Sequence, residues 1–137
     1  MPEVVSIQFT QDQARTLTGV SVETVRHWRK TVPYLSSKTG KAARFTFAEL
    51  LGLAVAHELV HSFGVHIATL STSIDELFRM LATNGPASLE GTVVFITATE
   101  VTFHEMEADG LSKVPEKSAF MVPLAPLMTG IQRHMLP

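Results

Sequence analysis

The sequence contains one pattern of residues that is typical of metal-dependent hydrolysis. His57 and His61 stand four positions apart with Glu58 directly after the first, in the string His57-Glu58-Leu59-Val60-His61. On a helix, two imidazoles at this spacing share one face and can bind zinc, while the carboxylate can activate a zinc-bound water. The pattern raises the hypothesis of a zinc metallopeptidase, which would need a third ligand from elsewhere in the chain.

The sequence does not supply that third ligand in the expected place. In the longer string H-E-x-x-H-x-x-G-x-x-H the last histidine follows the glycine by three positions, whereas His66 follows Gly64 by two. Asp75 and Glu76 are alternative ligands that no further pattern supports. In addition, residues 10–30 are predicted to form two helices instead of the sheet that lines a zinc peptidase cleft. The metallopeptidase therefore stays a minor alternative.

Other catalytic chemistry has little support. The chain has no cysteine, which excludes thiol nucleophiles, disulfide scaffolds and thiolate metal sites. It also lacks a phosphate-binding P-loop, a G-x-G-x-x-G fingerprint and a G-x-S-x-G nucleophile elbow. We therefore predict that the protein is not an enzyme and requires no cofactor and no metal.

Charge is distributed unevenly along the chain. Residues 1–50 hold seven lysines and arginines against four carboxylates, a net charge of +3, while residues 51–137 hold four against nine, a net charge of −5. The two parts together give the net charge of −2 of the 137-residue chain. A basic N-terminal part next to an acidic remainder indicates that the N-terminal part binds a polyanion.

Two short helices with a tight turn between them are predicted in this basic part. Thr10 and Gln13 form a capping box for the first helix, which Gly19 ends. Ser21 then caps a second helix, and Pro33 closes the segment. The second helix has an apolar stripe that consists of Val22, Val25 and Trp28. This arrangement is typical of a helix-turn-helix, whose second helix enters the major groove of DNA.

The rest of the chain predicts a mixture of helices and strands. A β-hairpin over residues 34–45, with Gly40 at its turn, would form a wing beside the helix-turn-helix. Asn84-Gly85-Pro86 indicates a boundary between a domain over residues 1–85 and a smaller region over residues 86–137. The other predicted elements are a helix from Thr46 to about Phe63 stopped by Gly64, a helix that includes residues 74–81, strands over residues 92–103 and 120–122 with a polar loop between them, and a C-terminal helix from residue 124 onward.

These residues together resemble the winged helix-turn-helix of MerR-type transcription regulators over about residues 7–83. The matching positions are Ala14, Gly19-Val20-Ser21, Thr24-Val25-Arg26-His27-Trp28, Arg44-Phe45-Thr46, Glu49-Leu50 and Gly64. The chain departs from the family pattern at His27, where an aromatic residue is usual, and at Ala43, where the first of two wing arginines is usual. It also lacks the long dimerising helix of typical members. The expected fold class is a mainly helical α+β winged helix-turn-helix, followed by a small β-containing region with a terminal helix.

The predicted recognition helix, residues 22–30, and the wing carry side chains that suit DNA. Arginine and lysine can bind phosphates or guanine edges, and threonine can bind a phosphate or contact a thymine methyl group. The predicted DNA contacts are Thr24, Arg26, His27, Arg29 and Lys30 on the helix and Lys38, Lys41 and Arg44 on the wing. Trp28, Phe45 and Phe47 are instead predicted to pack in the core.

The sequence thus predicts a cytoplasmic, sequence-specific transcription regulator that binds double-stranded DNA. Residues 86–137 are expected to form a homodimer or to bind a protein partner, because Met121, Met128 and Met135 provide adaptable apolar surface. No secretory signal is apparent, and no apolar run reaches the roughly 18 residues that cross a membrane. A winged-helix protein-interaction module without DNA binding, such as an antitoxin-like protein or regulatory adaptor, is the main alternative. His27 and Ala43 favour it.

Overall fold

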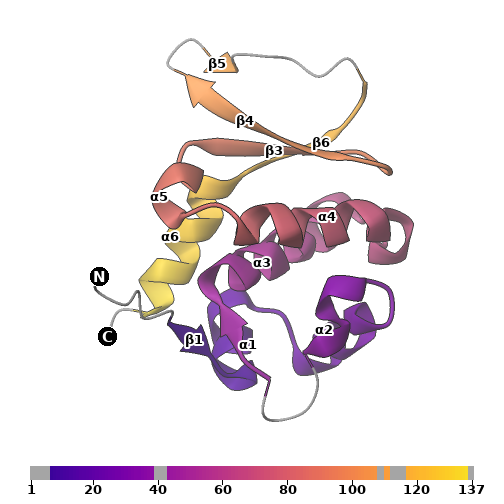
Figure 1. Cartoon of the computed structure of the whole chain (residues 1–137), viewed down its shortest axis with the longest axis vertical. Coiled ribbons are helices and arrows are strands. Elements are labelled where there is room, and N and C mark those ends of the chain that lie inside the picture. Colours follow the sequence, from indigo (N-terminus) through magenta and orange to yellow (C-terminus); the bar gives the residue numbers. More distant parts are fainter. Residues whose placement is uncertain (1–6, 39–42, 108–109, 112–116, 136–137) are drawn as a thin grey trace.

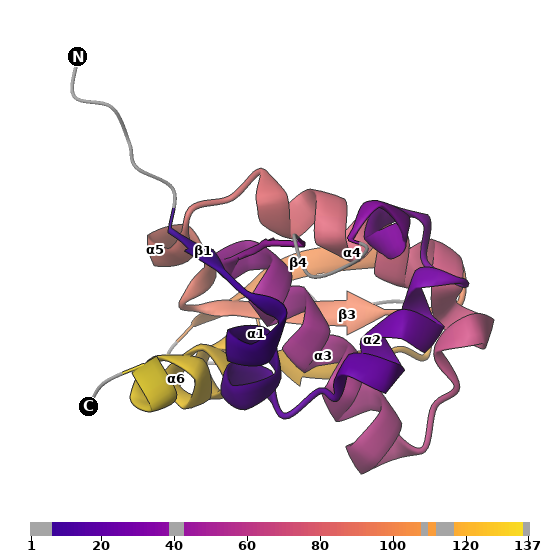
Figure 2. The same ribbon diagram turned by 90° about the horizontal axis from the view of Figure 1, so that it is seen from below.

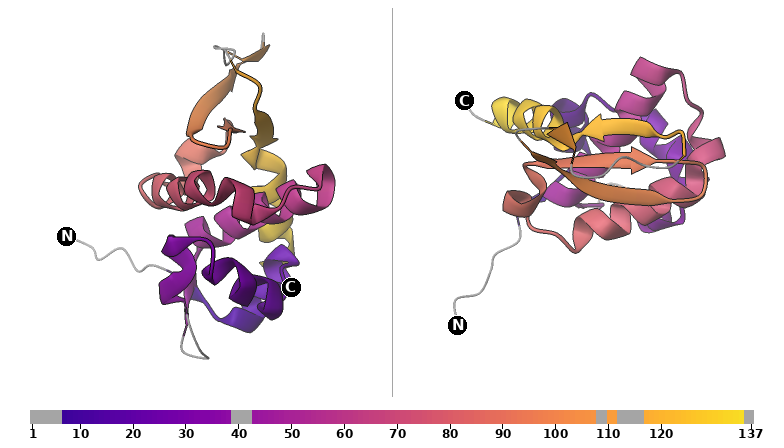
Figure 3. Two further views of the ribbon diagram at one scale, coloured as in Figure 1. Left: turned by 90° about the vertical axis from the view of Figure 1, so that its right-hand side faces the viewer. Right: turned by 90° about the horizontal axis from the view of Figure 1, so that it is seen from above.

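Three layers follow one another along the long axis of the molecule (Figures 1 and 3). The computed structural model describes residues 7–38, 43–107, 110–111 and 117–135. Two short helices lie at one end, longer helices form the middle, and a four-stranded sheet lies at the other end. In chain order the elements are β1 (Gln8–Phe9), α1 (Gln11–Thr18), α2 (Val22–Arg29), η1 (Pro33–Ser37), β2 (Phe45–Thr46), α3 (Phe47–Phe63), η2 (Ile67–Leu70), α4 (Ser71–Ala82), α5 (Pro86–Leu89), β3 (Thr92–Ile96), β4 (Val101–Glu107), β5 (Gly110–Leu111), β6 (Phe120–Pro123) and α6 (Leu124–Met135). The fold is a mainly helical α+β fold, as predicted.

The two short helices at the end of the molecule begin and end at the predicted residues. Thr10 and Gln13 form a complete capping box at the start of α1, and Gly19 ends the helix in the left-handed region with φ 79°. The Ser21 side chain accepts a hydrogen bond from the backbone N–H of Thr24 at the start of α2. The predicted helix-turn-helix is confirmed, and Figure 2 shows both helices on the face seen from below.

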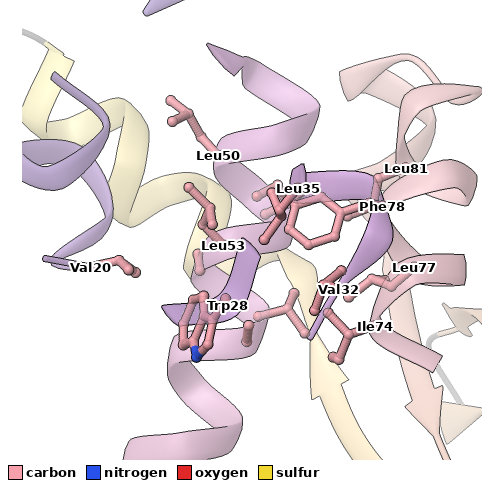
Figure 4. Close-up of a cluster of buried hydrophobic side chains, with 14 of the residues drawn as sticks. Val20, Trp28, Val32, Leu35, Leu50, Leu53, Ile74, Leu77, Phe78 and Leu81 are labelled. Atoms are coloured by element: carbon pink, nitrogen blue, oxygen red, sulfur yellow. The ribbon is translucent and has the colours of Figure 1, made fainter. Parts of the chain in front are cut away.

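The buried core joins the helix-turn-helix to α3 and α4 (Figure 4). Trp28 is 4% exposed and Leu53 is fully buried. Both residues belong to the same hydrophobic cluster. The predicted stripe of α4 is buried as well, and its members are Ile74, Leu77, Phe78 and Leu81. Phe45 is buried and Phe47 half-buried against the core, so their assignment to the core is also confirmed.

Helices α3 and α4 approach each other closely at a glycine. A Cβ atom added to Gly52 would lie 2.6 Å from Cδ1 of Phe78, which is closer than two carbon atoms can pack. The predicted limits of α3 are confirmed: Thr46 and Glu49 form a capping box, and Gly64 ends the helix with φ 67°. The two caps and the close contact with α4 fix the position of α3, against which the two short helices are placed.

The predicted hairpin over residues 34–45 is only partly correct. Its first half is the 3-10 helix η1, because Pro33 fixes the φ angle at the start of that turn. The strand at its other end, β2, pairs antiparallel with β1, with Phe9 opposite Phe45. A two-residue strand before α1, which the sequence analysis missed, thus supplies the partner. Gly40 and Lys41 lie outside the described residues.

The C-terminal part forms an antiparallel sheet in the order β5-β4-β3-β6. The strand predicted over residues 92–103 is two strands, β3 and β4, since Thr97 accepts hydrogen bonds from the backbone of Thr99 and Glu100 and closes a turn between them. Strand β4 extends to Glu107, so it includes part of the predicted polar loop. Strand β6 and the terminal helix α6 confirm the remaining predictions.

The last helix returns to the N-terminal end of the molecule. Helix α6 packs against α1 and α3, and Figure 2 shows it beside α1. One hydrophobic cluster therefore contains residues from both predicted parts of the chain, for example Ala14 and Ile131. The predicted division into residues 1–85 and 86–137 stays a prediction. In the part of the chain that the structure describes, no helix is both long and apolar enough to span a membrane.

Candidate nucleic-acid interface

Helix α2 has one buried and one exposed face. Val25 and Trp28 are 7% and 4% exposed and hold the inner face against the core. The exposed face carries the basic side chains Arg26, His27 and Lys30. Within the described part of the chain, the structure gives Arg26 and Lys30 no side-chain hydrogen bond or ion pair. Two cations therefore remain available on a surface whose position the core fixes.

Thr24 lies on the same helix but has an internal partner. Its hydroxyl is 2.8 Å from the Ser21 hydroxyl, and its backbone N–H donates to the same Ser21 oxygen at 3.1 Å. Thr24 is half-buried. Its side chain thus bonds to the cap of α2, at the turn that leads into the exposed face. When the Ser21 hydroxyl donates to it, the Thr24 hydroxyl keeps its own proton for a further acceptor.

Two of the predicted contact residues connect α2 to the segment before β2. Arg29 donates a hydrogen bond from its guanidinium group to the backbone carbonyl of Lys38. The Lys38 ammonium group donates to the Arg44 carbonyl at 2.8 Å and forms an ion pair with Glu49 at 3.1 Å. Lys38 is only 22% exposed in its side chain, and Glu49 is 5% exposed. Arg29 and Lys38 therefore hold the base of the predicted wing to the helices.

Glu49 is the centre of this arrangement. One carboxylate oxygen accepts from the backbone N–H of Thr46 at 2.8 Å, as part of the cap of α3. The other accepts from the hydroxyl of Tyr34 at 2.9 Å. A buried carboxylate is tolerated only when it is paired and hydrogen-bonded, and this one has a cation and two neutral donors. We call Tyr34, Lys38 and Glu49 the wing-base cluster.

Tyr34 extends the wing-base cluster to α4. Its backbone N–H donates to Asp75 at 2.6 Å, its ring stacks on Phe78 at 5.2 Å, and Arg79 pairs with Asp75 at 3.0 Å. Burial, followed by the hydrogen bond to Glu49 and its charge, raises the pKa of Tyr34 to about 12, against a smaller opposite effect of Arg79. The phenol consequently stays protonated and donates at any physiological pH.

Within the described residues, the remaining predicted contact, Arg44, lies next to the wing-base cluster. Arg44 is exposed directly before β2, and its guanidinium group donates to the carbonyl of Ala43 at 3.0 Å. Ala43, at the position where the resemblance places an arginine, is 8% exposed. The exposed side chains of Arg26, Lys30 and Arg44 thus lie on two segments, α2 and residues 43–44. Hydrogen bonds of Arg29 and Lys38 connect these segments.

The histidines of the H-E-x-x-H string do not form a peptidase centre. His57 and His61 lie together on α3, with ring centroids 4.0 Å apart. The Glu58 carboxylate accepts a hydrogen bond from Ser62 at 2.6 Å. The Asp75 carboxylate accepts from the backbone N–H of Tyr34 and forms an ion pair with Arg79. Among the described residues, no group of three or more histidine, aspartate or glutamate side chains is placed to hold a metal ion. The chemistry of a zinc peptidase therefore has no complete ligand set in this part of the chain.

Sequence reasoning missed the wing-base cluster, although one part of it had a signal. The T-x-x-E spacing of Thr46 and Glu49 predicts the backbone cap. That the same carboxylate also binds Tyr34 and Lys38 depends on how η1 folds over α3, which no local spacing encodes.

Comparison with known proteins agrees with this geometry. A sequence model of the MerR HTH family regulatory proteins matches residues 9–77, which include α1, α2, the wing-base cluster, α3 and the first part of α4. No curated protein and no solved structure matches the chain significantly.

Proposed function

Because the chain belongs to the MerR helix-turn-helix family of regulatory proteins, we propose that it is a sequence-specific DNA-binding transcription regulator with α2 in the major groove. The observation that carries the proposal is the exposed face of α2. Arg26 and Lys30 are exposed there without a side-chain partner in the described part of the chain. The opposite face is fixed by Trp28. A fixed helix with available cations is what direct readout of base edges requires.

The eight predicted residues divide into two roles in this proposal. Arg26, His27, Lys30 and Arg44 contact DNA directly, and Lys41 does so from the wing. Arg29 and Lys38 act mainly by fixing the wing relative to α2. Arg29 donates to the Lys38 carbonyl, and the Lys38 ammonium group binds the Arg44 carbonyl and one oxygen of Glu49. Thr24 donates its hydroxyl proton to a phosphate, which it can do while the Ser21 hydroxyl donates to the Thr24 oxygen. The wing lies on the flanking backbone.

Selection from a pool of random duplexes tests the proposal, followed by binding of the selected duplex to variants. We expect Arg26→Ala to weaken specific binding by about 1–3 kcal/mol and to relax the choice of base at one position if Arg26 reads a base. If Arg26 binds a phosphate, the loss is uniform across sequences and the salt dependence falls. Lys117→Ala, which removes one exposed positive charge before β6 in the sheet layer, is the matched control and should leave binding unchanged.

A protein-interaction module without DNA binding is the second candidate function. It is favoured by Ala43, which is buried where an exposed wing arginine would add phosphate affinity, and by His27 in place of an aromatic residue. This function would be favoured over the first if the selection enriched no duplex and the Arg26→Glu variant still bound the same protein partner as the parent.

We further propose that the protein acts as a homodimer. The sheet exposes two large apolar side chains, Met106 at 48% and Met121 at 45%. A second copy on a two-fold axis would present a second α2, and half-sites one helical turn, about 34 Å, apart would then be read together.

A further inference from the structure

Four of the six histidines line one cavity. The cavity has a volume of about 520 Å³, and its histidines are His27, His57, His61 and His66. One wall is the turn before α2 and one side of α2 itself, and the other is the C-terminal half of α3 with the connection to η2. The proposed DNA contacts use only His27 of this set. The cavity therefore contains imidazoles that the proposed function does not explain.

Two of these imidazoles are placed as a chelating pair. His57 and His61 are separated by one helical turn, and their rings lie 4.0 Å apart at the centroids with planes tilted by 37°. Side chains four positions apart on a helix project from the same face, so small rotations about the side-chain bonds bring one nitrogen of each ring to a common ion. Helix α3 is fixed at both ends by its caps, which holds the pair in register.

His57 is the inner, half-buried ring of the pair, and His61 is the outer, exposed ring. A histidine binds a metal through the neutral imidazole. The Glu58 carboxylate accepts a hydrogen bond from Ser62 at 2.6 Å.

We propose that His57 and His61 together bind one divalent transition-metal ion of the Zn²⁺, Ni²⁺ and Cu²⁺ class, which imidazole ligands suit. Water completes the coordination, because no third histidine or carboxylate in the described residues is placed to join the pair. The site is thus open and weaker than a structural zinc site with four protein ligands. It differs from a peptidase centre in having two protein ligands and no free carboxylate beside them.

An ion bound to the pair would lie close to the turn of the helix-turn-helix. A Cβ atom on Gly19 would lie 3.8 Å from Nε2 of His57, so the inner imidazole lies beneath the turn between α1 and α2. An ion at this place would connect α3 to the joint of the helix-turn-helix. The proposal does not depend on DNA binding, and its test is made without DNA.

Calorimetric titration of the full chain with Zn²⁺, after removal of any affinity tag and prior treatment with a chelator, tests the proposal. We expect one equivalent to bind. His61→Ala should weaken binding by at least about tenfold, because loss of even an outer partner of a metal ligand costs about 10–100-fold. His61 is exposed, so this variant retains the fold, which circular dichroism checks. His134→Ala, an exposed histidine on α6, is the matched control and should bind as the parent does.

Nuclear magnetic resonance of the histidine rings provides the second readout. Zn²⁺ should shift the ring nitrogens of His57 and His61 and leave those of His104 and His134 in place. Three results would each overturn the proposal. They are Zn²⁺ binding that does not saturate, an equal loss of Zn²⁺ affinity in His61→Ala and His134→Ala, and full Zn²⁺ affinity in His61→Ala.

Discussion

At the scale of single residues, the buried carboxylate of Glu49 connects three segments. It accepts from the cap of α3, from Tyr34 in η1 and from Lys38 directly after η1. Removal of one partner of such a group costs more than the net value of the bond, because the other partner stays buried and unpaired. The wing-base cluster is thus the point at which one substitution should affect both stability and the position of the predicted wing.

Tyr34→Phe isolates one bond of this cluster. The substitution keeps the stack on Phe78 and removes only the hydroxyl that donates to Glu49. We expect the free energy of unfolding to fall by about 1.5–3 kcal/mol, because Glu49 loses a hydrogen bond to a charged group and stays buried. Urea denaturation measures it. A variant as stable as the parent protein would mean that the bond contributes nothing.

His57 gives the stability a dependence on pH. Its pKa is lower in the folded chain than in the unfolded one, where it is about 6.5. Below pH 6.5 the unfolded state therefore binds more protons, so the free energy of unfolding falls as the pH falls, until the folded pKa is passed. His57→Gln, a neutral polar side chain, should lose less stability than the parent between pH 7.5 and 5.5. Denaturation in the presence of a chelator checks this, and equal losses would contradict it.

At the scale of elements, two helical glycines should respond to alanine in opposite ways, because only Gly52 lies at the close crossing of α3 and α4. In an exposed helix, glycine to alanine stabilises by roughly 0.5–1 kcal/mol. Gly130→Ala in α6 should show this gain, because an added Cβ meets no atom within 4 Å. Gly52→Ala should instead destabilise by about 1–3 kcal/mol, the usual cost of overpacking a core. Thermal unfolding of both variants compares them, and a gain at Gly52 would refute the close crossing.

The elements also show which features could be predicted from the sequence. Thr10, Ser21 and Thr46 predicted three helix starts, and Gly19 and Gly64 two helix ends, because capping depends on residues only a few positions away. The pairing of β2 with β1 joins residues 45–46 to residues 8–9 and has no local signal. The same holds for Lys38, whose charge predicts a contact with phosphate but whose burial beside Glu49 depends on tertiary packing.

At the scale of the whole molecule, the basic helix-turn-helix and the sheet lie at opposite ends, with α3 and α4 between them (Figure 1). This separation allows the two ends to act on different partners.

If the exposed methionines of the sheet form the proposed dimer interface, Met121→Lys should shift the protein toward a monomer in analytical ultracentrifugation. Met135→Lys, at a methionine of α6 that is 42% exposed, is the control. A dimer that persists in the first variant would place the interface elsewhere.

The central claim, that the basic end of the molecule binds DNA, is tested most directly by fluorescence anisotropy of a labelled random duplex over a series of salt concentrations. We expect binding that weakens steeply with salt, with a logarithmic slope of about −5 for roughly six phosphate contacts per dimer. An absence of binding even at low salt would contradict the claim.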